Sequence, residues 1–280
     1  MRDALTVLKR IRKHRKQGAE HSFMEAERAR EAQQERVDVI ANNLANMNTT
    51  GYQRRRAAFN DLIYEDNKRP NNRHSRADGL VPGGVKAGLG VRMAAAYRVV
   101  EQGNLAQTGN PYDLAIQGTG YIPVTLANGE TAYTRDGTFQ LNENGQVVTH
   151  DGYLLEPAIT VPEDAIDVTV NASGEVLVKI EGQVEFSNVG QIQTANFQNE
   201  PGLESIGNNL YKETPASGNA TVGNPGTEGY GTILQGFLET SNVNAVEEIS
   251  NLISAQRAYE MNSKVIQTSD EMLGTLTSLR

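Results

Sequence analysis

Apolar residues recur at helical spacing near both ends of the chain. Within residues 24–47, which contain neither Gly nor Pro, intervals of three and four residues link Val37, Ile40, Leu44 and Met47. This spacing places the four side chains on one face of a helix. The following turn, Asn48-Thr-Thr-Gly51, predicts the end of that helix, because Gly readily adopts the left-handed conformation common there.

A second helix is predicted over residues 244–279. Asn244 and Glu247 fit a capping arrangement at its start. Its apolar stripe, at three-four spacing, consists of Leu252, Ala255, Tyr259, Asn262, Ile266, Ser269, Leu273 and Leu276. The spacing is typical of coiled coils, in which polar members of the stripe lower stability but restrict register and partners. Each helix therefore needs a partner, either the other helix or a copy on a neighbouring molecule.

The region between the helices divides into three parts. Residues 54–98 are highly charged and then Gly-rich, which predicts an extended or partly disordered arm. Residues 99–216 alternate short β-branched or aromatic segments with turn dipeptides, which predicts an all-β antiparallel domain. Residues 217–243 are Gly-rich and predict a linker. The expected fold class is α+β.

Tight hairpins are expected at the turn dipeptides, since both residues of an Asn-Gly or Asp-Gly pair can adopt positive φ. The pairs are Asn128-Gly129, Asp136-Gly137, Asn144-Gly145 and Asp151-Gly152, with Ser173-Gly174 as a further candidate. The pattern predicts the strands but not their order in the sheets.

Charge is unevenly distributed along the chain. Residues 1–23 carry seven Lys and Arg against two acidic residues, whereas the whole chain has a net charge of -8. The acidic remainder argues against a nucleic-acid binder. Leu5, Leu8 and Ile11 within the basic segment allow two interpretations. One is an amphipathic helix that binds an anionic membrane or nucleic acid, and the simpler one is a solvated tail.

Catalytic and metal-binding chemistry has little support in the sequence. The chain has no Cys, and its four His residues lie in three separate regions. Nucleophile-elbow, zinc-protease and P-loop motifs are missing. No apolar run reaches membrane-spanning length, and no cleaved signal peptide is indicated. We expect no enzyme, no cofactor and no metal, and a carbohydrate-active β domain is the alternative.

Two long motifs carry a resemblance to flagellar rod and hook proteins. Residues 39–64, "VIANNLANMNTTGYQRRRAAFNDLIY", resemble their N-terminal signature, Asn-x-[Ile/Leu]-Ala-Asn-x-x-Thr-x-Gly-[Phe/Tyr]. The matching residues are Asn43, Leu44, Ala45, Asn46, Thr49 or Thr50, Gly51 and Tyr52. Residues 234–273 resemble the corresponding C-terminal signature, and the similarity covers roughly residues 32–280.

The resemblance implies a structural subunit. In this family the terminal helices pair as a coiled coil and line the inner tube of a helical assembly, with the β domain outside. The rod built from such subunits transmits torque through the periplasm to the hook. The implied partners are further copies, other rod and hook subunits, the surrounding basal-body rings and the flagellar type III export apparatus. Nucleic acid and membrane insertion are not implied, and the alternative within the family is another axial subunit.

The resemblance also divides the chain. Its parts are an atypical basic and charged extension (1–31), an inner-core helix and turn (32–53), the arm (54–98), the outer β domain (99–216), the linker (217–243) and a second inner-core helix (244–280). The residues expected at helix or subunit interfaces are Val37, Ile40, Asn43, Leu44, Asn46, Thr50, Gly51, Tyr52, Leu252, Tyr259, Asn262, Ile266, Leu273 and Leu276. The extension departs from the family pattern. A misassigned start, an altered sequence and a genuine extension are the alternatives.

The Asn residues on and just beyond the first helix need a reason, because Asn is unfavourable inside helices. They are Asn42, Asn43, Asn46 and Asn48. We expect Asn46 and Asn48 to shape the turn at the helix end. Asn42 and Asn43 are candidates for polar contacts that fix the register between packed helices, since an unpaired buried amide costs about 1–3 kcal/mol. Exposure of these amides to solvent is the alternative.

Overall fold

The computed structural model describes residues 2–68, 85–182 and 185–278, which form two compact units. The helical unit combines residues up to 42, residues 55–97 and residues from 246 onward. The β unit combines residues 43–54 with residues 98–245. Both units therefore contain segments that lie far apart in the sequence, so neither corresponds to one continuous stretch of chain.

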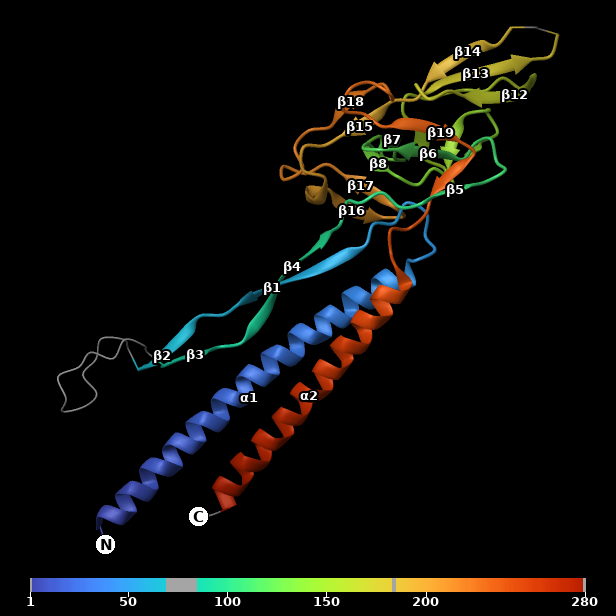
Figure 1. Ribbon diagram of the computed structural model, residues 1–280. Helices are drawn as coiled ribbons and strands as arrows, with labels where there is room; N and C mark the ends of the chain where they lie inside the picture. The colour runs from blue at the N-terminus through green and yellow to red at the C-terminus, as the bar shows by residue number, and fades with distance from the viewer. Residues whose placement is uncertain (1, 69–84, 183–184, 279–280) are drawn as a thin grey trace. The chain divides into compact units, whose positions relative to one another are not determined.

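Two long helices, α1 (Arg2–Ala45) and α2 (Ala245–Ser278), lie side by side in the helical unit (Figure 1). The Ser22 and Ser269 hydroxyl oxygens are 3.3 Å apart, which marks where the two helices meet. Ala255 and Ser269 are both buried, and they lie fourteen residues apart, close to four helical turns. One face of α2 is therefore covered by the rest of the unit.

Helix α1 begins earlier than the sequence predicts. The sequence indicates a separate extension over residues 1–31, whereas the structure has one helix from Arg2 to Ala45. This stretch contains no Pro and only one Gly, Gly18, so no residue in it forces a break.

A two-stranded ribbon forms the rest of the helical unit. Strand β1 (Arg55–Asp61) pairs with β4 (Val91–Arg98), and β2 (Tyr64–Lys68) pairs with β3 (Val85–Gly88). The Arg28 guanidinium donates to the Leu89 carbonyl at 2.7 Å, which ties the ribbon to α1. The predicted arm over residues 54–98 is thus a paired ribbon where the structure describes it. Residues 69–84 of that arm lie outside the described part.

The β unit is built from antiparallel pairings, as the turn signals predict. Its largest sheet has the order β16 (Glu204–Gly207), β17 (Leu210–Lys212), β8 (Thr131–Thr134), β7 (Ile122–Thr125), β11 (Leu154–Leu155), β10 (Val147–Thr149) and β9 (Phe139–Leu141). A three-stranded sheet has the order β12 (Ala165–Val170), β13 (Glu175–Ile180) and β14 (Ser187–Gln191).

Three two-stranded pairs and a short helical turn complete the β unit. The pairs are β6 (Leu114–Gln117) with β19 (Thr232–Gln235), β5 (Leu105–Gln107) with β20 (Phe237–Glu239), and β15 (Thr194–Asn196) with β18 (Thr221–Gly223). The 3-10 helix η1 spans Glu200–Gly202.

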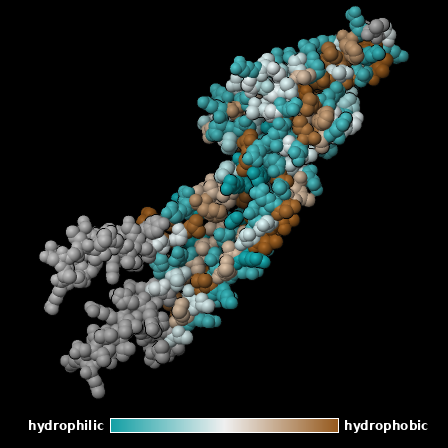
Figure 2. All heavy atoms as spheres, viewed as in Figure 1, coloured by the Kyte–Doolittle hydropathy of each residue, from teal (hydrophilic) through white to brown (hydrophobic). Residues whose placement is uncertain are grey.

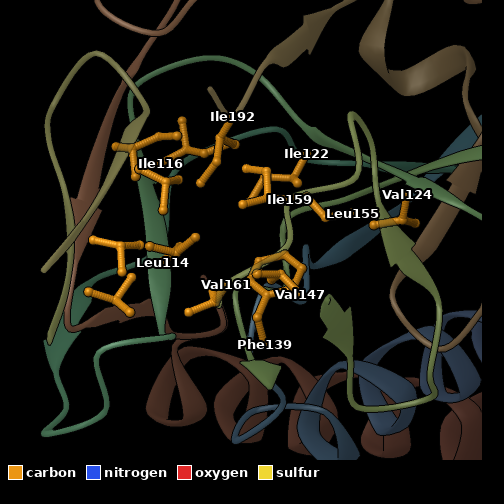
Figure 3. Close-up of a cluster of buried hydrophobic side chains, with 14 of the residues drawn as sticks. Leu114, Ile116, Ile122, Val124, Phe139, Val147, Leu155, Ile159, Val161 and Ile192 are labelled. Carbon is orange, nitrogen blue, oxygen red and sulfur yellow. The ribbon is translucent and has the colours of Figure 1, made fainter. Parts of the chain in front are cut away.

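The largest sheet is buried on both faces at β8 and β17, whereas β16 at its edge is exposed. Alternating residues of a strand point to opposite faces, so Ala132 and Leu210 join the main aliphatic core, whereas their neighbours Tyr133 and Tyr211 join an aromatic cluster. Figure 3 shows the aliphatic core, to which β6, β7, β9, β10 and β11 all contribute. In the aromatic cluster the Tyr133 and Phe197 rings pack edge to face with centroids 4.8 Å apart.

Four of the five predicted hairpin turns are confirmed. Gly129, Gly145, Gly152 and Gly174 have positive φ and lie in turns between paired strands. The prediction at Asp136-Gly137 is wrong, because the strands on either side of it, β8 and β9, do not pair. Gly137 instead lies against β6, where a Cβ atom would be 1.6 Å from the Leu114 carbonyl oxygen.

The segment 217–243 is not a linker. It contributes β18, β19 and β20, and Ile233 of β19 is buried in the aliphatic core. The six Gly residues of this segment are typical of a flexible connection, yet two of them meet a close neighbour. A Cβ atom at Gly231 would lie 2.6 Å from the Gln117 carbonyl oxygen, so this Gly allows close packing of backbone on backbone.

Replacing Gly137 with Ala should destabilise the β unit, because the added methyl group would collide with the backbone of Leu114. We expect a loss of about 1–3 kcal/mol or more in the free energy of unfolding, measured by urea titration. Gly109→Ala is the matched control, since nothing lies within 4 Å of a Cβ atom there. Equal stability of the two variants would contradict the close approach.

Candidate functional site: the junction of the chain ends

The turn after α1 is held by its own polar side chains. The Thr49 hydroxyl donates to Asn46 Oδ1 at 3.2 Å, and the Thr49 amide donates to the Asn46 carbonyl at 3.2 Å. Asn43, which is almost completely buried, accepts a hydrogen bond from the Tyr52 hydroxyl at 3.2 Å. Both Asn side chains thus form hydrogen bonds within the turn. Such bonds favour ending the helix over continuing it.

Gly51 fixes this turn to the C-terminal signature. Its amide donates to the Glu239 carbonyl at 2.8 Å, and its φ is +66°. A Cβ atom at this position would lie 2.8 Å from both the Arg135 carbonyl carbon and the Asp136 nitrogen. Gly is therefore required here twice, once by backbone conformation and once by the close approach of another chain segment.

Thr50 connects the turn to two further segments of the β unit. Its hydroxyl donates to Asp136 Oδ1 at 3.0 Å, and its carbonyl accepts a hydrogen bond from Asn209 Nδ2 at 2.7 Å. Asn208 and Asn209 both have positive φ in the tight turn between β16 and β17. Asn tolerates that conformation better than other residues with a side chain, so the hairpin can present an amide to the turn.

A buried ion pair joins the two residues whose backbone contacts Gly51. Arg135 Nε is 3.0 Å from Glu239 Oε2, and both side chains are less than 5% exposed. The remaining Glu239 oxygen accepts from the Gly103 amide at 3.0 Å, and the Arg135 guanidinium also donates to the Gly118 carbonyl. Each charge thus has a partner in addition to the other, which a buried pair requires.

Burial raises the pKa of Glu239 above its usual value. The positive charge of Arg135 and the hydrogen bond from Gly103 act in the opposite direction but do not cancel the effect of burial. The charged form of Glu239 is therefore disfavoured by burial, and it lies where four chain segments converge.

Asn242 joins three of these segments with one side chain. Its Oδ1 accepts from the Arg54 amide at 2.7 Å, and its Nδ2 donates to the carbonyls of Val99 and Glu101 at 3.0 and 2.9 Å. The side chain thus links the end of the N-terminal signature, the chain returning from the ribbon, and the C-terminal signature. All its amide hydrogen-bonding groups act on backbone, so it stabilises the chain path itself.

These contacts define the junction: residues 43–54, 98–103, 135–136 and 239–242, together with Asn209. It brings together the two signatures, which residues 65–233 separate in the sequence. Of the interface residues predicted from the sequence, the junction includes Asn43, Leu44, Asn46, Thr50, Gly51 and Tyr52. The junction connects these segments mechanically, because hydrogen bonds and a buried ion pair join residues of different segments.

The other predicted interface residues lie in the helical unit. Ile40 is buried, whereas Val37, Leu252, Tyr259, Asn262, Ile266 and Leu273 are half-buried. The side chain of Leu276 lies outside the described residues. These positions describe one chain, so the predicted roles of the residues between subunits stay predictions.

Sequence reasoning missed Arg135, Glu239, Asn209 and Asn242 as parts of the site. Glu239 and Asn242 belong to the C-terminal signature, so the motif itself was a signal for them. No local pattern marks Arg135 or Asn209, because their importance comes from partners distant in the sequence.

Catalytic geometry is not found at the junction. Among the residues described, no three His, Cys, Asp or Glu side chains gather closely enough to hold a metal ion. Neither helix, over its described length, has an apolar stretch that could span a membrane.

Three family models match three separate parts of the chain. The flagella basal body rod protein model matches residues 25–53, the flagellar hook protein FlgE/F/G D1 domain model matches residues 115–178, and the flagellar basal body rod FlgEFG protein C-terminal model matches residues 234–279. The first and third models contain the two signature segments of the junction, and the second contains Arg135.

Relatives match nearly the whole chain. FlgG, a flagellar basal-body rod protein, from Caulobacter vibrioides is 55% identical over 249 residues, which is 89% of this chain and 95% of that protein. FlgG from Bacillus subtilis is 38% identical and covers 88% of this chain and 94% of its own length. FlhP, a flagellar hook-basal body complex protein from Bacillus subtilis, is 32% identical with the same coverage.

Replacing Gly51 with Ala should destabilise the β unit more than the same change at Gly218. Both positions have positive φ, which costs an Ala about 1–2 kcal/mol, but only Gly51 has backbone atoms within 3 Å of the added Cβ. We expect a further loss of about 1–3 kcal/mol for Gly51→Ala, measured by urea unfolding of the full chain. Equal losses would show that conformation alone selects Gly51.

Burial should make stability depend on pH through Glu239. Since the pKa of Glu239 is raised in the folded state, protonation favours folding. This contribution is fully present below the ordinary pKa of 4.5 and is lost as the pH rises through the folded pKa. The difference in unfolding free energy between the unmodified chain and Glu239→Gln should therefore shift in favour of the unmodified chain as the pH falls from about 7 to 4.5. The opposite trend would indicate a lowered pKa.

Proposed function

Because this chain belongs to the FlgG family of flagellar basal-body rod proteins, we propose that it is a structural subunit of the distal rod. In this role it polymerises helically into the drive shaft that transmits torque from the motor to the hook during motility. The observation that supports this most is that its likeness to FlgG proteins extends over nearly the whole chain and includes both signatures that build the junction.

The two helices would form the inner part of the shaft as a coiled coil, with the β unit outside. The contact between Ser22 and Ser269 and the burial of Ala255 support this pairing. The three-four stripe of α2 lies on the same face as Ala255, which is the pattern expected for a helix pair. The polar residues Asn262 and Ser269 within it would restrict the register.

The junction would carry load within the β unit, from the turn that follows α1 to the segments packed against that turn. Torque applied to one part of a subunit reaches another part only through contacts that do not yield. A buried ion pair such as Arg135 and Glu239 favours one geometry, because each alternative arrangement would leave a charge without its partner. A rigid connection is the mechanical property that a drive shaft needs.

The remaining expected partners follow from this role. They are further copies in a helical homopolymer, the other rod and hook subunits, and the rings that surround the rod in the periplasm. Delivery through the flagellar type III export apparatus, without a cleaved signal peptide, completes the proposal. The arm over residues 54–98 would brace neighbouring subunits against bending.

Another axial subunit, the proximal rod or the hook protein, is the second candidate. It is favoured by the family models, which group FlgE, FlgF and FlgG together, and by the similarity to FlhP. The identity of 55% to one FlgG protein favours the distal rod. Protein composition of isolated rods, separated from hooks, distinguishes these two candidates.

Replacing Ile266 with Asp should abolish rod assembly, because it places a charge on the half-buried stripe of α2. Leu252→Asp and Leu273→Asp should act in the same way. Gln267→Asp is the control, since its side chain is exposed and the added charge is the same. Assembly is measured by electron microscopy of basal bodies from cells that express each variant in place of the unmodified protein.

The β unit should stay folded in all four variants, as judged by the near-ultraviolet circular dichroism of the buried tyrosines Tyr121, Tyr133 and Tyr211. Normal rods built from Ile266→Asp would contradict the proposed role of the helices.

A further inference from the structure

Helix α2 also carries exposed apolar side chains that lie roughly 80–160° around the axis from Ala255. This outer stripe consists of Ile249, Ile253, Met261, Val265 and Met272, each between 44% and 63% exposed. A helix advances 100° per residue, so Ile253 lies 200° around the axis from Ala255, which is completely buried. Figure 2 shows apolar side chains gathered over the first half of α2. An exposed apolar surface of this kind is characteristic of an interaction site.

A groove of about 300 Å³ lies elsewhere in the helical unit, between α1 and the ribbon. Its apolar lining comes from Ala32 on α1 and from Leu62, Val91 and Met93 on the ribbon. Charged residues of both signs, Arg28, Glu31, Glu35 and Arg92, complete the lining. The groove thus combines an apolar surface with a charged border, like many sites that receive a helix.

The groove and the outer stripe are on different helices and both are open in the single chain. On α1, Glu31 and Glu35 of the groove lie roughly 180–220° around the axis from Ser22, which contacts α2. The groove therefore lies away from the α1 face that contacts α2. Two complementary surfaces at different places on one molecule produce a head-to-tail contact, which repeats from copy to copy.

We propose that the groove of one copy receives Ile249 and Ile253 from α2 of a second copy. This contact rests on the proposed function, because it specifies which surfaces meet when the subunits polymerise. Burial of the two Ile side chains against Leu62, Val91 and Met93 supplies the apolar part of the contact. Arg257, one turn beyond Ile253 and exposed on the same stripe, then lies within reach of Glu31 and Glu35.

Disulfide cross-linking tests this contact directly, since the chain contains no Cys of its own. Two variants, Met93→Cys and Ile253→Cys, are expressed together in cells lacking the unmodified protein. Each copy then has a single thiol, so a disulfide between positions 93 and 253 can form only between copies. Basal bodies are isolated and oxidised, and the cross-linked pair is identified by mass spectrometry of the joined peptides.

Ala94→Cys, paired with Ile253→Cys, is the matched control. Ala94 is exposed and does not line the groove, and adjacent residues of a strand point to opposite faces, so position 94 is directed away from Met93. We expect cross-linking from position 93 and at least tenfold less from position 94. If Met93→Cys prevents assembly, Val91→Cys replaces it, because both residues line the groove.

The outcomes separate this contact from the function on which it rests. Rods that assemble without a link between positions 93 and 253, or with an equal link from position 94, overturn the contact and leave the rod function in place. A link from position 93 to a different protein also overturns it. Intact basal bodies that lack this chain altogether overturn the proposed function, and the contact with it.

Discussion

The buried pair of Arg135 and Glu239 is the interaction on which the rest of the junction depends. Gly51 donates to the Glu239 backbone and packs against the Arg135 backbone, so the N-terminal turn is held at both members of the pair. Removing either charge would leave the other buried without its partner, an outcome far more costly than the net value of the pair. The pair therefore favours one arrangement of the converging segments by penalising the others.

Asparagine has a consistent use throughout this chain. Asn209 and Asn242 bond the backbone of segments that meet at the junction, and Asn43 and Asn46 accept hydrogen bonds from side-chain hydroxyls of the turn after α1. An amide side chain both donates and accepts, so one residue can replace the paired backbone that irregular segments lack. The residues that look unfavourable inside a helix are therefore suited to the point where the helix ends.

The sequence predicts elements whose cause is local. Three-four spacing reveals both helices, and Asn-Gly, Asp-Gly and Ser-Gly pairs reveal four hairpins, because turn and helix preferences act over a few residues. Gly137 and the strands within 217–243 were misassigned, since Gly there serves close packing against segments distant in the sequence. Likewise, the partnership of Arg135 with Glu239 has no local signature. The terminal motifs pointed to half of the junction, and its partners in the β unit required the structure.

The junction also governs when the fold can be completed. Asn242 holds the Arg54 amide across 188 residues of intervening sequence, and Asn209 holds Thr50 across 159. Contacts between residues so far apart in the sequence close large loops. They form late in folding, because closing a large loop costs chain entropy before the contacts stabilise the fold. Whichever end of the chain is delivered first, its signature has no partner until most of the molecule is present. The complete junction therefore forms only in a chain that contains both signatures, and a chain truncated before either one cannot form it.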